Sequence, residues 1–150
     1  MNDKTRDNTN AKTFVDTNVL VYAYDADAGN KHLAAKALLE ELWENRSGVL
    51  STQVLQEFYV NVTRKIAKPL TQATARTIVD SYGVWCTDMT FADIAAAFRI
   101  EDQARISFWD ALICAAALKS GAVRILSEDL HAGQKIAGIR VENPFVRAKR

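Results

Sequence analysis

Short apolar segments alternate with longer amphipathic segments along this chain. Each short segment is rich in β-branched or aromatic residues and ends on a polar residue, which is typical of a buried strand. The strands predicted in this way are 13–16, 48–51, 84–87 and 123–127, with 139–143 as a fifth candidate.

The segments between the predicted strands follow the period of a helix. Leu33, Ala37, Leu38 and Leu42 lie on one stripe of the segment 31–44, which is the pattern of a helix packed on a sheet. Helices are expected at 18–25, 31–44, 52–67, 71–82, from Thr90 onward and at 107–119. The last of these is apolar almost all round, so it is expected to be buried between layers.

Strands that alternate with helices predict an α/β fold with a mainly parallel sheet of four to five strands and helices on both faces. The length of 150 residues indicates one domain, which we place at 13–146. Residues 1–12 are polar and are expected to form a flexible tail, and 147–150 form a short basic tail.

Composition excludes several classes of protein. No apolar run reaches the ~20 residues that span a bilayer, and the polar start lacks the apolar core of a secretory signal. A cytoplasmic protein without membrane contact is therefore expected. The formal net charge of +1 provides no broad basic field for nucleic acid. Cys86 and Cys114 lie in apolar segments and are expected to be reduced core thiols.

Four acidic residues stand where buried elements begin or end: Asp16, Glu57, Asp110 and Asp129. An ionised carboxylate buried without a partner is unfavourable by several kcal/mol or more, roughly. In parallel sheets the functional site lies beyond the carboxyl ends of the strands, so all four could meet at one edge. Two such charges about 4 Å apart repel by roughly 4 kcal/mol at an effective dielectric of 20, which a divalent cation would remove.

Each acid also has an ordinary structural explanation. Asp16 precedes a helix as an N-cap does, and Asp110 follows Ser107 as in a capping box. Glu57 fits a solvated helix edge, and Asp129 fits a turn. Independent capping explains each residue alone, but it does not predict four acids at the same kind of junction.

Four motifs in order carry a family resemblance. FVDTNVLVYAYD, LQEFY, FWDALICAAALKSG and LSEDL resemble the successive motifs of PIN-domain ribonucleases, most closely the toxins of VapBC-type toxin–antitoxin pairs. The resemblance extends from Thr13 to about Val141. It implies a three-layer α/β/α sandwich and an endoribonuclease that binds Mg²⁺ or Mn²⁺.

The resemblance also implies roles for individual residues. The acids that match the catalytic ones are Asp16, Glu57, Asp110 and Asp129, and the metal ligands among them are Asp16, Asp110 and Asp129. Thr17, Asn18 and Ser127 match supporting positions, and Ser127 replaces a Thr that the family often has. Glu128 is the alternative to Asp129 as the fourth acid.

The partners implied are an RNA substrate, a cognate antitoxin protein and a second copy of the chain in a homodimer. As a toxin, the protein would inhibit translation or growth. Alternatives are a PIN-domain nuclease without a toxin role, a phosphate-handling acid-cluster enzyme and a non-catalytic binding module. The phosphate-handling enzyme is disfavoured because Asn18 stands where a haloacid-dehalogenase-type site has a second Asp.

Overall fold

A computed structural model of the protein describes residues 11–130 and 132–146. Most of the two expected tails therefore lies outside the described residues, although Lys12 already begins the first strand. The strands are β1 (Lys12–Val15), β2 (Gly48–Ser51), β3 (Cys86–Thr87), β4 (Ala122–Leu126), β5 (Lys135–Ile136) and β6 (Ile139–Glu142). The helices are α2 (Thr17–Tyr24), α3 (Asn30–Asn45), α4 (Thr52–Arg64), α5 (Gln72–Ser81), α6 (Phe91–Ala104) and α7 (Phe108–Lys119), with 3₁₀ turns at Ala26–Ala28 and Tyr82–Trp85.

Within the described residues the strands form one six-stranded sheet in the order β3-β2-β1-β4-β6-β5. All neighbouring strands run parallel except β5, which runs antiparallel to β6. The predicted parallel sheet is confirmed. Both outer strands, β3 and β5, have only two residues.

The sequence pattern missed β5, which makes the sheet larger than the four to five strands expected. Ala137 and Gly138 connect β5 to β6, and both have positive φ angles of 52° and 83°. Two successive residues of this kind form the tight turn that suits a two-residue hairpin. An alanine in this conformation is uncommon, so the turn gave little signal in the sequence.

Two other boundaries differ from the prediction. Helix α4 ends at Arg64, three residues before the predicted end and well before Pro69. Strand β3 is shorter than predicted because residues 82–85 form the 3₁₀ turn, which places Trp85 over β2. A Cβ atom at Gly48 would lie 2.5 Å from the Trp85 ring, so a side chain at position 48 would displace this indole.

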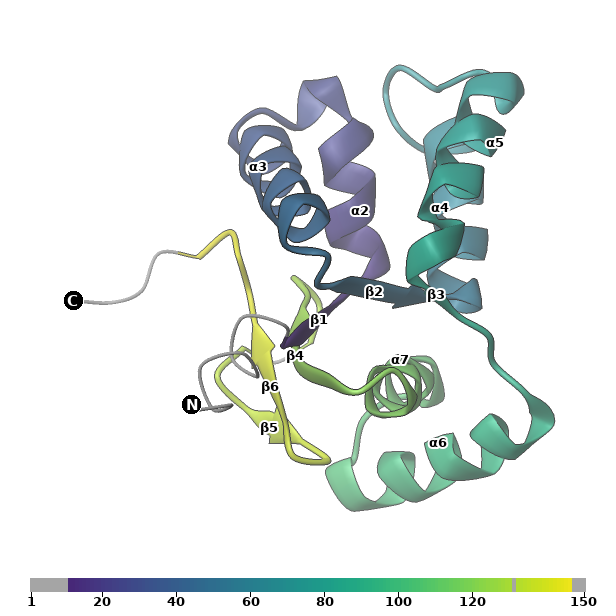
Figure 1. Ribbon diagram of the computed structural model, residues 1–150, viewed down its shortest axis with the longest axis vertical. Coiled ribbons are helices and arrows are strands. Elements are labelled where there is room, and N and C mark those ends of the chain that lie inside the picture. The colour runs from purple at the N-terminus through teal and green to yellow at the C-terminus, as the bar shows by residue number, and fades with distance from the viewer. Residues whose placement is uncertain (1–10, 131, 147–150) are drawn as a thin grey trace, which may run out of the picture.

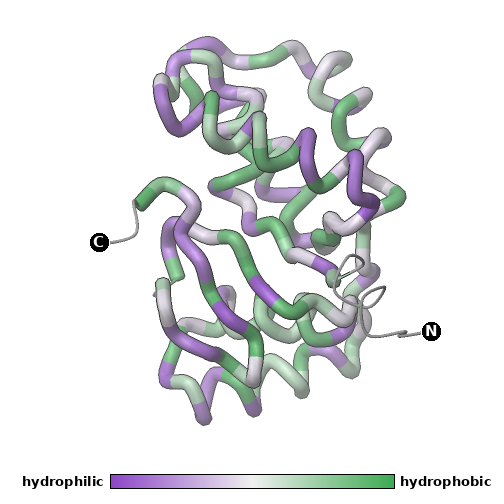
Figure 2. The backbone as a smooth tube through the Cα atoms, turned by 60° about the vertical axis from the view of Figure 1, so that its left-hand side comes forward, coloured by the Kyte–Doolittle hydropathy of each residue, from purple (hydrophilic) through white to green (hydrophobic). Residues whose placement is uncertain are grey.

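The helices cover both faces of the sheet, as the three-layer prediction requires (Figure 1). Helices α2 to α5 lie on one side, and α6 and α7 lie on the other. Helix α7 contacts both β2 and β4, and its buried residues are mostly small, which allows the close approach of helix and sheet. The helices alternate between hydrophobic and hydrophilic positions along their length, as expected when one face of each is buried (Figure 2).

Among the residues described, no helix has the length and apolar character needed to cross a membrane.

Candidate functional site

Asp16 occupies the junction between β1 and α2. It is the N-cap of α2, and its side chain is only 6% exposed. One carboxylate oxygen, Oδ1, accepts a hydrogen bond from the Thr17 backbone N–H at 2.7 Å. The other, Oδ2, accepts one from the Ser127 hydroxyl at 2.7 Å. The capping explanation is therefore correct for Asp16, but the residue also faces a second strand end.

The surroundings of Asp16 act on its protonation. Burial raises the pKa of the Asp16 carboxyl from 3.8 to about 6, while the bonds from Ser127 and Thr17 lower it and the nearby Glu57 and Asp129 raise it further. A carboxyl in this position would gain stability from a cation, because a cation offsets both the lost hydration and the repulsion from the neighbouring acids.

Glu57 reaches the same place from α4. Its Oε2 accepts a hydrogen bond from the Thr17 hydroxyl at 2.7 Å, and its Oε1 accepts one from the Gln53 side-chain amide at 2.9 Å. The carboxylate is thus held in a fixed orientation by two elements. Sequence reasoning missed Gln53, although its position one turn before Glu57 was a usable signal.

Gln53 carries one further feature. Gln53 is 8% exposed, and its Oε1 is the one buried side-chain polar atom without a hydrogen-bond partner among the described residues. Buried acceptors of this kind are normally paired with water or a ligand. The unpaired oxygen therefore remains available to a water molecule or another donor.

Asn18 connects α2 to the loop after β4. Its side-chain amide donates to Asp129 Oδ2 at 3.0 Å, and its Oδ1 accepts the Glu128 backbone N–H at 3.1 Å. Ser127 secures the same loop, because its Oγ accepts the backbone N–H groups of Asp129 and Leu130, each at 3.2 Å. The supporting residues expected from the sequence therefore hold Asp129 beside Asp16.

The neighbouring Glu128 points elsewhere. Its carboxylate accepts a hydrogen bond from the Tyr22 hydroxyl at 2.9 Å and pairs with the Lys31 ammonium at 2.7 Å. Lys31 Nζ also lies 5.1 Å from the centre of the Tyr22 ring. Glu128 is thus neutralised by a cation, whereas Asp129 is not, so the geometry favours Asp129 as the fourth acid.

Asp110 lies in the first turn of α7, half-buried, with its backbone N–H donating to the Ser107 hydroxyl at 3.1 Å. It approaches the Asp16 region from the other face of the sheet. Burial raises the pKa of the Cys114 thiol to about 12, and the charges of Asp110 and Asp16 contribute in the same direction. Both carboxylates therefore lie within electrostatic range of this thiol.

The convergence of the four acids is partial. In residues 11–130 and 132–146, no hydrogen bond joins Asp110 to Asp16, Glu57 or Asp129, and none of the four acids forms an ion pair. No group of three or more His, Cys, Asp or Glu side chains in this part of the chain is close enough to hold a metal ion. The structure brings Asp16, Glu57 and Asp129 to one edge of the sheet, whereas Asp110 stays on α7, which covers the opposite face from α2 and α4 (Figure 1).

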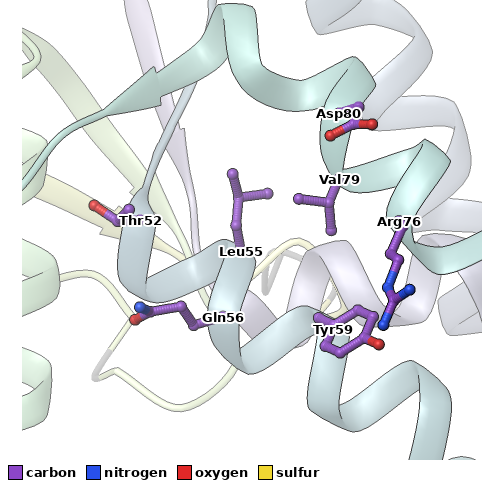
Figure 3. Close-up of a pocket in the computed structure, with 7 residues that line it drawn as sticks. All are labelled: Thr52, Leu55, Gln56, Tyr59, Arg76, Val79 and Asp80. Carbon is purple, nitrogen blue, oxygen red and sulfur yellow. The ribbon is translucent and has the colours of Figure 1, made fainter. Parts of the chain in front are cut away.

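A cavity of about 280 Å³ opens over this edge. It is lined by Thr17, Asn18, Val21, Tyr22, Glu57, Asn61 and Asp129. A larger cavity of about 450 Å³ lies between α4 and α5, where Leu55 and Val79 face each other and the Arg76 side chain lies near Tyr59 (Figure 3). The second cavity contains none of the four acids, so the smaller one is the candidate site.

Comparison with known proteins identifies the family and the fold. A family model described as PIN domain matches residues 13–135. A search of curated protein sequences gives no significant match. Three solved structures share the fold at low sequence identity. A toxin–antitoxin complex from Klebsiella pneumoniae has a TM-score of 0.64 at 19% identity, covering 89% of this chain and 98% of that one.

The other two structures are comparable. DNA-bound VapBC from Salmonella typhimurium has a TM-score of 0.63 at 18% identity, covering 89% of this chain and 98% of that one. The VapC20 toxin of Mycobacterium tuberculosis, described as cleaving the sarcin–ricin loop, has a TM-score of 0.57 at 20% identity, covering 79% and 90%. At these identities the similarity establishes the fold.

Proposed function

Because the chain belongs to the PIN domain family, we propose that it is a metal-dependent endoribonuclease that hydrolyses phosphodiester bonds of RNA. One observation carries the proposal. The buried Asp16 carboxyl lies within electrostatic range of Glu57 and Asp129, and no cationic side chain in the described part of the chain forms an ion pair with any of the three. Such a set of oxygen ligands suits a hard divalent cation.

The chemistry of the donor set suits Mg²⁺ or Mn²⁺, because both prefer carboxylate oxygens, although the described side chains are not close enough to enclose an ion as they stand. Asp16 and Asp129 would hold the ion from the β1 and β4 ends, and Asp110 would have to move toward them from α7 to complete the set. The raised pKa of Asp16 supports a positively charged occupant, because a cation would offset the burial of this carboxylate and its repulsion by Glu57 and Asp129. When bound, such an ion would supply a Lewis acid that activates water and neutralises charge developing on the phosphate.

The chain's own groups would then orient the reactants. Thr17 and Gln53 fix both oxygens of Glu57, so this carboxylate can accept a hydrogen bond from the attacking water at a constant angle. Asn18 holds Asp129 in the same way. Phosphodiester cleavage by this route needs no covalent intermediate with the protein.

Substitution of the acids tests the proposal. Asp16→Asn and Asp110→Asn are each expected to lower the rate of cleavage of single-stranded RNA in Mg²⁺ or Mn²⁺ at least about 100-fold, because an amide is a poor ligand for a hard cation. Circular dichroism should show an unchanged fold. Full activity of both variants, or wild-type cleavage that persists in EDTA, would refute the proposal.

We further propose that the protein is the toxin of a toxin–antitoxin pair and acts as a homodimer. Support for the toxin role comes from the solved structures of the same fold, two of which are named as toxin–antitoxin or VapBC complexes; the homodimer is proposed from the family resemblance alone. Overproduction of the wild type, but not of Asp16→Asn, should arrest growth, and co-expression of the adjacent reading frame should relieve the arrest. Growth that continues during overproduction would remove the toxin role while leaving the nuclease proposal intact.

A further inference from the structure

Trp109 is a large, exposed aromatic side chain at the start of α7. Trp109 is 63% exposed, and it immediately precedes Asp110 in the first turn of α7. Large apolar side chains in such positions are often part of binding surfaces. The function proposed above does not use this ring.

The chain path places Trp109 at the edge of the sheet where the acids gather. Helix α7 passes through the turn at Ser120 and Gly121 into β4, so helix and strand run in opposite directions. The 12 residues of α7 and the five of β4 have similar lengths, about 18 Å and about 16 Å. The start of α7 therefore returns to the level at which β4 ends.

The Phe108 ring contacts the indole of Trp109, and Phe98 in turn contacts Phe108. The Phe108 and Trp109 ring centres lie 5.3 Å apart with an interplanar angle of 66°, and Phe108 lies 5.5 Å from Phe98 of α6. These contacts restrict the orientation of Trp109. A partner that stacks on the ring would therefore lose less conformational entropy on binding.

Positive charge is available on the same loop. Arg105 ends α6 in a left-handed conformation, with φ of 54°, and is exposed four residues before Trp109. Within the described residues neither Arg105 nor the exposed Arg99 forms an ion pair. An aromatic ring accompanied by unpaired guanidinium groups is a combination that suits single-stranded nucleic acid.

We propose that Trp109 stacks on a nucleobase adjacent to the scissile phosphate and so positions single-stranded RNA across the acids. The proposal rests on the endoribonuclease function. Stacking of one base on an aromatic side chain corresponds to roughly a 5- to 100-fold change in binding. Trp109 would thus be a substrate-contacting residue that acts on KM more than on kcat.

A protein partner is the competing occupant, because Phe91 and Ile94 are also exposed on α6. Phe91 is 89% exposed, and its position seven residues before Phe98 places it about 10 Å further along the helix. A protein that covered this face would contact Phe91 as well as Trp109. A nucleobase next to Asp110 would contact Trp109 alone, and the position of Trp109 directly before Asp110 favours RNA.

The experiment compares Trp109→Ala, Trp109→Phe and the control Phe91→Ala in the full chain. Cleavage of a short single-stranded RNA of mixed sequence is measured in Mn²⁺, together with Mn²⁺ affinity and molar mass by light scattering. Trp109→Ala should raise KM roughly 5- to 100-fold with kcat, Mn²⁺ affinity and mass nearly unchanged. Trp109→Phe should restore most of the affinity, and Phe91→Ala should match the wild type.

RNA binding is also followed directly in the Asp16→Asn background, where the RNA is not cleaved. Bound RNA should quench the tryptophan fluorescence of the protein, and Trp109→Phe should abolish most of this quenching. A wild-type KM for Trp109→Ala, or quenching that survives its removal, would overturn the proposal. So would a loss of molar mass in both Trp109→Ala and Phe91→Ala, which would identify a protein interface. A wild type that binds but does not cleave RNA would instead refute the nuclease function and leave the stacking result in place.

Discussion

Replacement of Asp16 by Asn should make the protein more stable at neutral pH, although it removes a central group of the site. The pKa of Asp16 is raised from 3.8 to about 6 in the folded chain, chiefly by burial. Each pKa unit corresponds to roughly 1.4 kcal/mol, so the ionised carboxylate costs the folded state about 3 kcal/mol at pH 7. Asn does not ionise and avoids this cost.

The substitution also loses a hydrogen bond. Ser127 Oγ donates to Asp16 and already accepts two backbone N–H groups, so it offers no acceptor to an Asn amide. The unpaired group costs roughly 1–2 kcal/mol. A net stabilisation of about 1–2 kcal/mol should therefore remain at pH 7.

The sign of the effect depends on pH. Because the folded pKa lies above the unfolded one, the unfolded state ionises first, and wild-type stability falls as the pH rises from about 4 to about 6. Below pH 4 the carboxyl is protonated in both states, and only the lost hydrogen bond remains. Asp16→Asn should thus be less stable than the wild type at pH 4 and more stable at pH 7.

Urea unfolding in EDTA at several pH values measures this crossover, and the exposed Asp102→Asn is the matched control. Adding Mn²⁺ at pH 7 should raise the stability of the wild type and not that of Asp16→Asn. An Asp16→Asn variant that is less stable at every pH, with an unchanged pH slope, would show that desolvation of this carboxyl does not govern the site.

Two further substitutions probe particular contacts. Glu128→Gln should keep the rate of RNA cleavage within about threefold of the wild type, whereas Asp129→Asn should lower that rate at least about 100-fold. The reason is that only the Asp129 carboxylate is held by Asn18 at the cavity. Equal losses of activity in a gel-based cleavage assay would contradict this division. Gly48→Ala should destabilise the protein by about 1–3 kcal/mol in thermal or urea unfolding, because its methyl group would displace the Trp85 ring, and an unchanged melting temperature would count against that packing.

The sequence predicted the parallel sheet, and it predicted that Asp16 and Asp129 would lie beyond the carboxyl ends of their strands, because each follows a short apolar segment. Asp16 is the plainest case, since a charge at the end of a buried strand needs a compensating contact. The N-cap at Ser107 was equally local and is confirmed, although among the described residues the Asp110 carboxylate does not return the hydrogen bond that a capping box requires. Such features depend on neighbours within a few residues, which is the range over which a sequence pattern is readable.

The details of the site could not be predicted, because they depend on distant contacts. Whether Glu128 or Asp129 enters the cavity is decided by Asn18 and Lys31, which lie about a hundred residues earlier. The hydrogen bonds to Gln53 depend on side-chain orientation within α4. Asp110 is carried by α7, whose placement against β2 and β4 is a contact between distant parts of the chain that no local pattern encodes.

The two outer strands of the sheet have a consequence for self-association. With only two residues each, β3 and β5 expose few free backbone groups, so they are poor templates for another chain to extend. A homodimer of this protein should therefore be built from helix surfaces and not from a continuous intermolecular sheet. Short edge strands also disfavour ordered aggregation, because that process starts from long edge strands with unpaired backbone groups.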